Sequence, residues 1–336
     1  MTQDATAQKI ILDCDTGIDD TLALMYLFGS EDVEILGVVG TFGNVTEGQA
    51  ALNNRALLDA AGLADIPAYR GIEVPSFDKI STHYEVDEGC ERFHGKNGWG
   101  GAQLDLPESV QRGAILDDGV SFEAEVIEKY GTDLTVIATG PLTNIDAVLT
   151  RRPELARKLH LVIMGGALTQ LGNCYNLISE TNMVNDPEAA NRVFHSGADI
   201  TVVGIDVTHK TLMTRAHVET FAREGGKTGQ FVAQALRYYV NANEQSDPVF
   251  LAGSPLHDPL AVAVALDPSL VSCFPINLMV DLEGPQRGRT VGDPTLINAP
   301  AEHVRMALGV DSPRFVSQWH ERTLRAFERM NKHLAA

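Results

Sequence analysis

The chain has 336 residues, 44% of them hydrophobic, and a formal net charge of −19 at pH 7. This length allows a large buried core in one α/β domain, and no run of about 18 apolar residues predicts a membrane span. The acidic surface would repel phosphate backbones, so we expect no nucleic acid partner.

The N-terminal residues and the cysteines both indicate a cytoplasmic protein. The opening segment, MTQDATAQK, is polar and lacks the apolar region of a signal peptide. The cysteines are widely spaced and form no CxxC pair, which argues against a zinc ribbon or a disulfide framework. They are Cys14, Cys90, Cys174 and Cys273.

Short apolar runs alternate with helical patterns along the chain. Continuous Val, Ile and Leu runs are typical of strands buried on both faces of a parallel sheet. These runs cover residues 9–15, 33–40, 134–140, 159–166 and 200–206. Helical patterns follow each of the first four, which predicts βαβ units and an open, mostly parallel, doubly wound α/β sheet flanked by helices. In such sheets ligands bind at the carboxyl ends of the strands.

Three further segments complete the predicted organisation as one domain spanning residues 1–336. Residues 73–118 are Gly-rich and poorly periodic, which is typical of a functional loop near an active site. Residues 208–257 are mostly helical in pattern and predict a cap over the sheet edge. The C-terminal stretch from residue 312 predicts a closing amphipathic helix.

Four aspartates crowd the stretch DCDTGIDD, residues 13–20. Asp13 and Asp15 end an apolar run and share a strand face, while Asp19 and Asp20 open the following helix. Helix capping accounts for one or two of them, but not for four. Like charges held this close must share protons or a cation, and all-oxygen ligands favour Ca²⁺ or Mg²⁺.

Two families fit an aspartate-rich first strand. The DxDxT pattern resembles haloacid-dehalogenase-type phosphatases, but the Asp19–Asp20 pair does not belong to that pattern. DCDTGIDD instead resembles the signature of the inosine-uridine-preferring nucleoside hydrolases. Five more segments match that family in order: IATGPLTN (137–144), VIMGG (162–166), ETNMVNDPEAA (180–190), GIDVTH (204–209) and LHDPLAV (256–262).

The resemblance implies a Ca²⁺-dependent enzyme that hydrolyses the N-glycosidic bond of ribonucleosides such as inosine or uridine, in nucleoside salvage. It implies the nucleoside hydrolase fold and a homodimer or homotetramer. The implied metal ligands are Asp15, Asp20, Asp258 and the backbone carbonyl of Thr139. Asp15 would also be the general base that deprotonates a metal-bound water. Asp13 would support the ligands or the ribose site without binding the metal directly.

The resemblance also implies the substrate contacts. Asp19 and Asn44 would bind the 2′ and 3′ side of the ribose, and Met164 would pack beneath the ring. Asn173, Glu180 and Asn182 would bind the 5′ side, with Asn176 as a competing candidate because the usual spacing is displaced by one residue. Thr181 stands where close relatives often carry an aromatic residue.

Protonation of the leaving base is assigned by the same resemblance. His257 matches the family's general acid, and a neighbouring carboxylate is expected to favour its imidazolium. His94 would lie near the base, and Tyr238 or Tyr239 could stack on it or donate a hydrogen bond to it. The only tryptophans, Trp99 and Trp319, do not form an obvious purine-stacking pair.

Two other functions remain open from the sequence. The altered 173–181 segment is compatible with a modified nucleoside or another N-riboside as substrate. A noncatalytic Ca²⁺ and ribose-binding protein is also compatible with the acidic set, although the presence of both Asp15 and His257 favours catalysis.

Overall fold

The computed structural model describes residues 7–246 and 252–336. At its centre is one sheet, in the order β10 (Val271–Pro275), β13 (Val304–Val310), β7 (Asp199–Val203), β6 (His160–Met164), β5 (Leu134–Ala138), β1 (Gln8–Cys14), β2 (Val33–Gly40), β3 (Ala68–Arg70) and β4 (Ile115–Leu116). Neighbouring strands run parallel except β10 against β13. The predicted open, mostly parallel sheet is confirmed.

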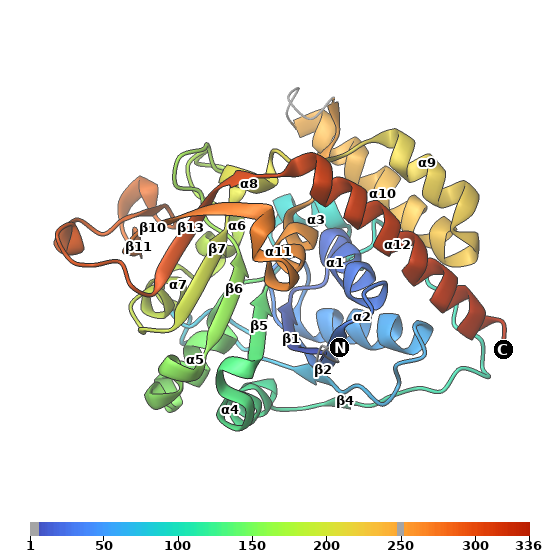
Figure 1. The fold of residues 1–336 in the computed structure, drawn as a ribbon, viewed down its shortest axis with the longest axis horizontal. Coiled ribbons are helices and arrows are strands. Elements are labelled where there is room, and N and C mark those ends of the chain that lie inside the picture. The colour runs from blue at the N-terminus through green and yellow to red at the C-terminus, as the bar shows by residue number, and fades with distance from the viewer. Residues whose placement is uncertain (1–6, 247–251) are drawn as a thin grey trace, which may run out of the picture.

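Helices cover both faces of the sheet and divide the core into two layers (Figure 1). One layer packs α1 (Ile18–Phe28), α2 (Glu47–Ala60), α11 (His257–Leu266) and α12 (Ser312–Leu334) against the sheet. The other layer packs α4 (Gly119–Tyr130), α5 (Thr143–Arg151) and α7 (Pro187–Phe194). Both faces of the central strands are therefore buried, as their continuous apolar sequence requires.

A helical cap lies beside α1 and α12, as the sequence predicts. It consists of α9 (Arg215–Glu224) and α10 (Gly226–Ser246), whereas residues 247–251 of the predicted cap lie outside the described residues. The ring of Phe221 in α9 lies 5.3 Å from that of Trp319 and 5.2 Å from that of Phe327. The amphipathic α12 therefore fastens the cap to the rest of the core.

The predicted irregular segment, residues 73–118, contains only α3 (Glu88–His94) and β4 as regular elements. Trp99 anchors it, because the indole Nε1 donates to Thr21 Oγ1 of α1 at 2.9 Å. No helix among the described residues has the length and apolarity to cross a membrane. The N-terminal segment MTQDATAQK, in which the sequence predicts no signal peptide, lies mostly outside the described residues.

Candidate active site

The aspartates predicted from the sequence meet at the carboxyl edge of the sheet. Asp13 lies at the end of β1, Asp15 follows it, and Asp19 and Asp20 form the first turn of α1. Asp258 arrives from the first turn of α11, more than two hundred residues later in the chain. This edge is the expected ligand-binding side of an open parallel sheet.

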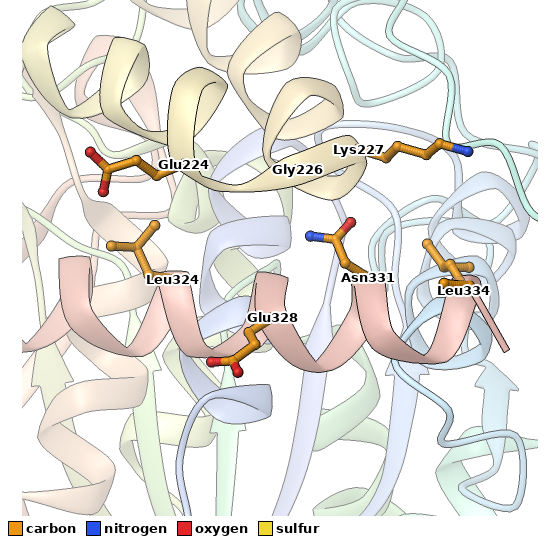
Figure 2. Close-up of a pocket in the computed structure, with 8 residues that line it drawn as sticks. Glu224, Gly226, Lys227, Leu324, Glu328, Asn331 and Leu334 are labelled. Atoms are coloured by element: carbon orange, nitrogen blue, oxygen red, sulfur yellow. The ribbon is translucent and has the colours of Figure 1, made fainter.

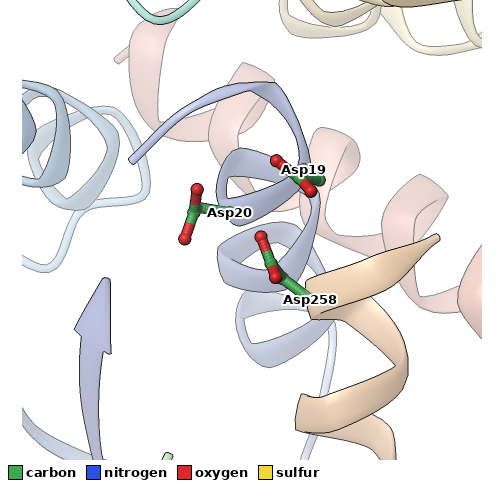
Figure 3. Close-up of side chains that lie close together, drawn as sticks. All are labelled: Asp19, Asp20 and Asp258. Carbon is green, nitrogen blue, oxygen red and sulfur yellow. The ribbon is translucent and has the colours of Figure 1, made fainter. Parts of the chain in front are cut away.

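Asp19, Asp20 and Asp258 form a compact carboxylate cluster (Figure 3). One oxygen from each lies within 4.8 Å of the others, and all three side chains are buried. Asp19 Oδ1 and Asp258 Oδ2 have no hydrogen-bond partner. Among residues 7–246 and 252–336, this is the group of His, Cys, Asp and Glu side chains placed closely enough to hold a metal ion.

The electrostatics of this cluster fit a cation. Burial, opposed in part by hydrogen bonds, raises the pKa of Asp19 from 3.8 to about 6. Burial and the charge of Asp19 raise the pKa of Asp20 to about 6. Burial and the neighbouring aspartates raise the pKa of Asp258 well above its usual value. Ionised together without a counter-charge, these groups destabilise the fold, so the donor set and its unpartnered oxygens suit a hard divalent cation.

Asp15 is held beside the cluster by Asn44, which follows β2. The Asn44 N–H donates to Asp15 Oδ2 at 2.7 Å, and its Nδ2 donates to Asp15 Oδ1 at 3.2 Å. The same Nδ2 reaches Asp20 Oδ2 at 3.4 Å. The Thr139 hydroxyl donates to Asp20 Oδ1 at 2.7 Å, so the four residues share one hydrogen-bonded group. A carboxylate fixed in this way keeps its orientation when its charge changes.

Gly17 and Gly43 allow this close approach of backbone and side chains. A Cβ at Gly17 would lie 2.4 Å from His94 Nδ1, and one at Gly43 would lie 2.0 Å from Asp15 Oδ2. Gly43 also has a φ of 151°, which side chains rarely allow. The turns between β1 and α1 and after β2 therefore require glycine.

His94 closes the site from the end of α3. Its Nδ1 accepts the N–H of Ile18 at 3.1 Å and lies 3.8 Å from Asp19 Oδ1. Burial lowers the pKa of His94 to about 4. His94 is therefore neutral with its proton on Nε2, and that N–H is free of the α1 contact.

His257 differs from its sequence-based expectation. It is buried beside Asp258, and its Nδ1 lies 2.8 Å from Thr208 Oγ1 of α8 (Ile205–Thr208). Burial, and after it the proximity of the His209 and His94 imidazoles, lowers the pKa of His257 well below its usual value. The expectation that a neighbouring carboxylate favours the imidazolium is wrong for this environment, because burial and neighbouring histidines outweigh that attraction.

Glu180 and Asn182 form the opposite wall, at α6 (Thr181–Asn185). Glu180 caps the helix, and its Oε2 also accepts the N–H of Gly166 at 2.9 Å. Asn182 Nδ2 donates to the carbonyls of Thr139 at 2.7 Å and of Met164 at 3.1 Å. The Thr139 carbonyl therefore lies between this wall and the acidic cluster.

The two candidate asparagines in the preceding loop differ in their contacts. Asn173 is exposed, and its Oδ1 accepts the N–H of Thr181 at 3.0 Å and its hydroxyl at 3.1 Å. Asn176 stabilises the turn in which it lies, because its Oδ1 accepts the N–H groups of Ile178 and Ser179. Only Asn173 has its side chain at the α6 wall.

Of the two tyrosines in α10, Tyr239 lies nearer the acidic cluster. It is buried, its ring lies 5.7 Å from that of His94, and burial with the charges of Asp19 and Asp258 raises its pKa. Tyr238 is 37% exposed, and its hydroxyl donates to the Glu91 carbonyl of α3 at 3.2 Å. The structure therefore brings Tyr239 to the cluster and places Tyr238 at the junction of cap and loop.

Glu123 is a buried carboxyl behind the site that the sequence analysis missed. It lies on α4 against Asp13, whose other oxygen accepts Asn144 Nδ2 at 3.3 Å. Burial and the charge of Asp13 raise the pKa of Glu123 well above its usual value, and burial raises that of Asp13 to about 7. The detectable signal is a glutamate on the apolar face of a helix, between Val120 and Ile127.

A separate surface groove lies between the α9–α10 junction and the end of α12 (Figure 2). Its volume is about 670 Å³, and it is lined by Glu224, Lys227, Leu324, Glu328, Asn331 and Leu334, among others. Asn331 is occupied structurally, because it bonds Thr228 and the Gly225 carbonyl. The groove lies outside the aspartate cluster and brings together no comparable set of ligands.

Comparison with known proteins agrees with this geometry. The family model for inosine-uridine preferring nucleoside hydrolases matches residues 10–317. Uridine nucleosidase 1 of Arabidopsis thaliana is 34% identical over 287 residues, covering 85% of this chain and 82% of that protein. The pyrimidine-specific ribonucleoside hydrolase RihA of Salmonella gallinarum is 31% identical over 318 residues, covering 94% of this chain and 98% of that protein.

A solved structure supports the same assignment. A purine-preferring ribonucleoside hydrolase from Gardnerella vaginalis superposes with a TM-score of 0.88 at 42% identity, covering 95% of this chain and 99% of that chain. The chain belongs to the inosine-uridine preferring nucleoside hydrolase family, and it is a hydrolase of N-glycosidic bonds in ribonucleosides.

Proposed function

We propose that the chain is a Ca²⁺-dependent hydrolase that splits inosine- or uridine-like ribonucleosides into free base and ribose. The observation that carries the proposal is the buried acidic edge, where oxygens of Asp19, Asp20 and Asp258 converge within 4.8 Å and Asp258 Oδ2 is unpartnered. Asp15 is not one of these three, but the Asn44 amide that bonds it also reaches Asp20. Repulsion among ionised carboxylates this close destabilises the fold unless a cation binds between them. A divalent cation can also activate the water that hydrolysis of a glycosidic bond requires.

The residues proposed to hold Ca²⁺ are Asp15, Asp20, Asp258 and the Thr139 carbonyl. All supply oxygen atoms, and Asp20 already contacts both Thr139 and the Asn44 amide that holds Asp15. When bound, the cation supplies positive charge that acidifies a coordinated water and offsets the repulsion among the carboxylates.

The role proposed for Asp15 is to accept the proton of the attacking water. Its two oxygens are oriented by the Asn44 N–H and Nδ2, so little reorganisation is needed at the moment of proton transfer. Departure of the nucleobase leaves positive charge on the ribose, as in other glycosidic cleavages. The surrounding carboxylates stabilise that charge because they are fixed in a site screened from water.

The two walls of the site are proposed to hold the ribose. Asp19 and Asn44 bind its 2′ and 3′ side, and Glu180, Asn182 and Asn173 bind its 5′ side. Met164 packs beneath the ring. The support is positional, since the Asn182 amide spans the carbonyls of Thr139 and Met164.

His257 is proposed to donate a proton to the departing nucleobase. His94 is proposed to lie near the same nucleobase. The Nδ1 of His257 is engaged by Thr208, so Nε2 is the nitrogen available to substrate. The lowered pKa of His257 makes its imidazolium a stronger acid, while its neutral form can still donate a hydrogen bond from Nε2.

The experiment is a steady-state panel on the purified protein, using inosine, adenosine, guanosine, uridine, cytidine and a nitrophenyl riboside. Products are separated to detect free base and ribose, and calcium is measured on the same sample. Hydrolysis of inosine or uridine with bound Ca²⁺ supports the proposal. Turnover of the nitrophenyl riboside alone would show that the natural leaving group is another base, and no turnover of any substrate would refute the proposal.

A further inference from the structure

Tyr84, in the irregular segment 73–118, contacts residues on two sides of the site. It is half-buried, and its ring packs on that of Phe42 with centroids 4.7 Å apart. Its hydroxyl donates to Asn185 Oδ1 at 3.2 Å. One side chain thus contacts two elements that are far apart in the sequence.

These two elements are the opposite walls of the site. Phe42 is completely buried and precedes Asn44, whose amide groups orient Asp15. Asn185 ends α6, the helix that begins beside Glu180 and carries Asn182. The Tyr84 side chain therefore bridges these two walls.

The environment of the Tyr84 ring keeps its phenol protonated. Burial, followed by the charges of Cys90 and Asp15, raises the pKa of Tyr84. The phenol therefore keeps its proton and can donate to Asn185 at neutral pH.

The α6 wall does not provide a bulky side chain of its own at this point. Thr181 is small, and its hydroxyl is engaged by Asn173 Oδ1 at 3.1 Å. Its other neighbour is the Cys174 thiol, 3.5 Å from the same hydroxyl. The bulky side chain that contacts α6 from the loop is Tyr84, which bonds Asn185, three residues after Asn182.

The loop that carries Tyr84 is anchored independently of it. The N–H and hydroxyl of Ser76 donate to the two oxygens of Asp186, at 2.6 and 2.8 Å. The Phe77 ring lies 5.0 Å from the Arg287 guanidinium. The position of the ring is thus set by several contacts along the loop.

We propose that the Tyr84 ring closes the ribose pocket beyond the 5′-hydroxyl and sets the enzyme's discrimination against nucleosides extended at that position. This inference rests on the proposed function, in which Glu180 and Asn182 bind the 5′ side. A pocket wall of this kind excludes larger substrates by steric conflict, and removal of an aromatic ring opens enough space for a few additional atoms.

The test compares uridine with 5′-O-methyluridine, and inosine with 5′-O-methylinosine, in the full-length enzyme. Tyr84→Ala should raise the ratio of kcat/KM for the methylated over the parent nucleoside by about tenfold or more, since the wall is lost. Tyr84→Phe keeps the ring and loses only the Asn185 hydrogen bond, so its ratio should stay close to that of the wild type.

Phe77→Ala is the matched control, because it loosens the same loop through loss of the Arg287 contact but leaves the ring over the pocket. An unchanged ratio in Tyr84→Ala would overturn the inference. An equal rise in Phe77→Ala or Tyr84→Phe would also overturn it, because loop mobility or the hydroxyl would then be responsible.

A failure of the proposed function gives a different result. Wild-type protein that hydrolyses neither parent nucleoside refutes that function, and calorimetric binding of the same nucleoside pairs then tests the pocket directly. Tighter relative binding of the methylated compounds to Tyr84→Ala than to wild type supports the wall. The same relative affinity in both proteins, or no binding by either, overturns it.

Discussion

The carboxylate cluster predicts that its own contribution to the stability of the metal-free protein falls as the pH rises from about 5 to about 7. The lowered pKa values of His94 and His257 act in the opposite direction over the same range, so the carboxylate contribution is isolated by comparing the protein with and without Ca²⁺. The pKa of Asp19 and of Asp20 is raised from 3.8 to about 6 in the fold. Between these values the folded state binds more protons than the unfolded chain. The stability that these two carboxyls contribute is therefore greatest below the unfolded pKa and is lost as the pH rises through the folded pKa.

The size of the effect follows from these shifts. One pKa unit corresponds to about 1.4 kcal/mol, and integration between about pH 5 and pH 7 gives a little over 1 kcal/mol for each carboxyl, or about 3 kcal/mol for the pair. Asp15 and Asp258 add to the loss, because the pKa of each is also raised. Bound Ca²⁺ favours the ionised carboxylates and should remove most of this loss.

The assay is urea unfolding followed by tryptophan fluorescence, with EGTA or with Ca²⁺, at both pH values. Trp99 and Trp319 are both buried and report on loss of the fold. The stabilisation due to Ca²⁺ should be larger at pH 7 than at pH 5. Asp258→Asn should shrink that difference, whereas Asn at the exposed Asp65 should leave it unchanged. Equal stabilisation by Ca²⁺ at both pH values would refute the reasoning.

The remaining predictions concern single residues of the site. Asp15→Asn should retain the fold yet lose about 10²- to 10⁴-fold in kcat, measured on uridine beside its thermal unfolding; wild-type turnover would contradict its role as base. His257→Ala should lower turnover of inosine and uridine while sparing a nitrophenyl riboside, and equal loss on both would reject the acid role. Gly17→Ala should impair Ca²⁺ binding, measured by calorimetry, because its Cβ would lie 2.4 Å from His94 Nδ1; unchanged affinity would show that the turn can adjust.

Five strands of the sheet were predictable because each is a continuous apolar run in a buried part of the sheet. They are β1, β2, β5, β6 and β7. β1 spans Gln8–Cys14 against the predicted 9–15, and β2 coincides with the predicted 33–40. The short strands β3 and β4 at one end of the sheet and the C-terminal pair β10 and β13 at the other were not predicted. Their few residues or half-exposed faces leave no clear periodicity, and β10 and β13 become strands through their pairing with each other and with β7.

The acidic site could be predicted in part, because Asp13, Asp15, Asp19 and Asp20 are close in the sequence. The arrival of Asp258 in the same cluster depends on tertiary packing, and only the family resemblance indicated it. The environment of His257 was not predictable, since its pKa depends on burial and on histidines from other elements. The contacts of Tyr84 were equally hidden, because neither Phe42 nor Asn185 is near it in the chain.

The most direct test of the proposed function is a Ca²⁺ titration of chelator-treated protein in which bound calcium and uridine or inosine hydrolysis are measured on the same samples. Hydrolysis should be absent without Ca²⁺ and should rise in proportion to bound Ca²⁺, saturating at one ion per chain. Full hydrolysis by protein that contains no metal would contradict a catalytic role for the carboxylate cluster.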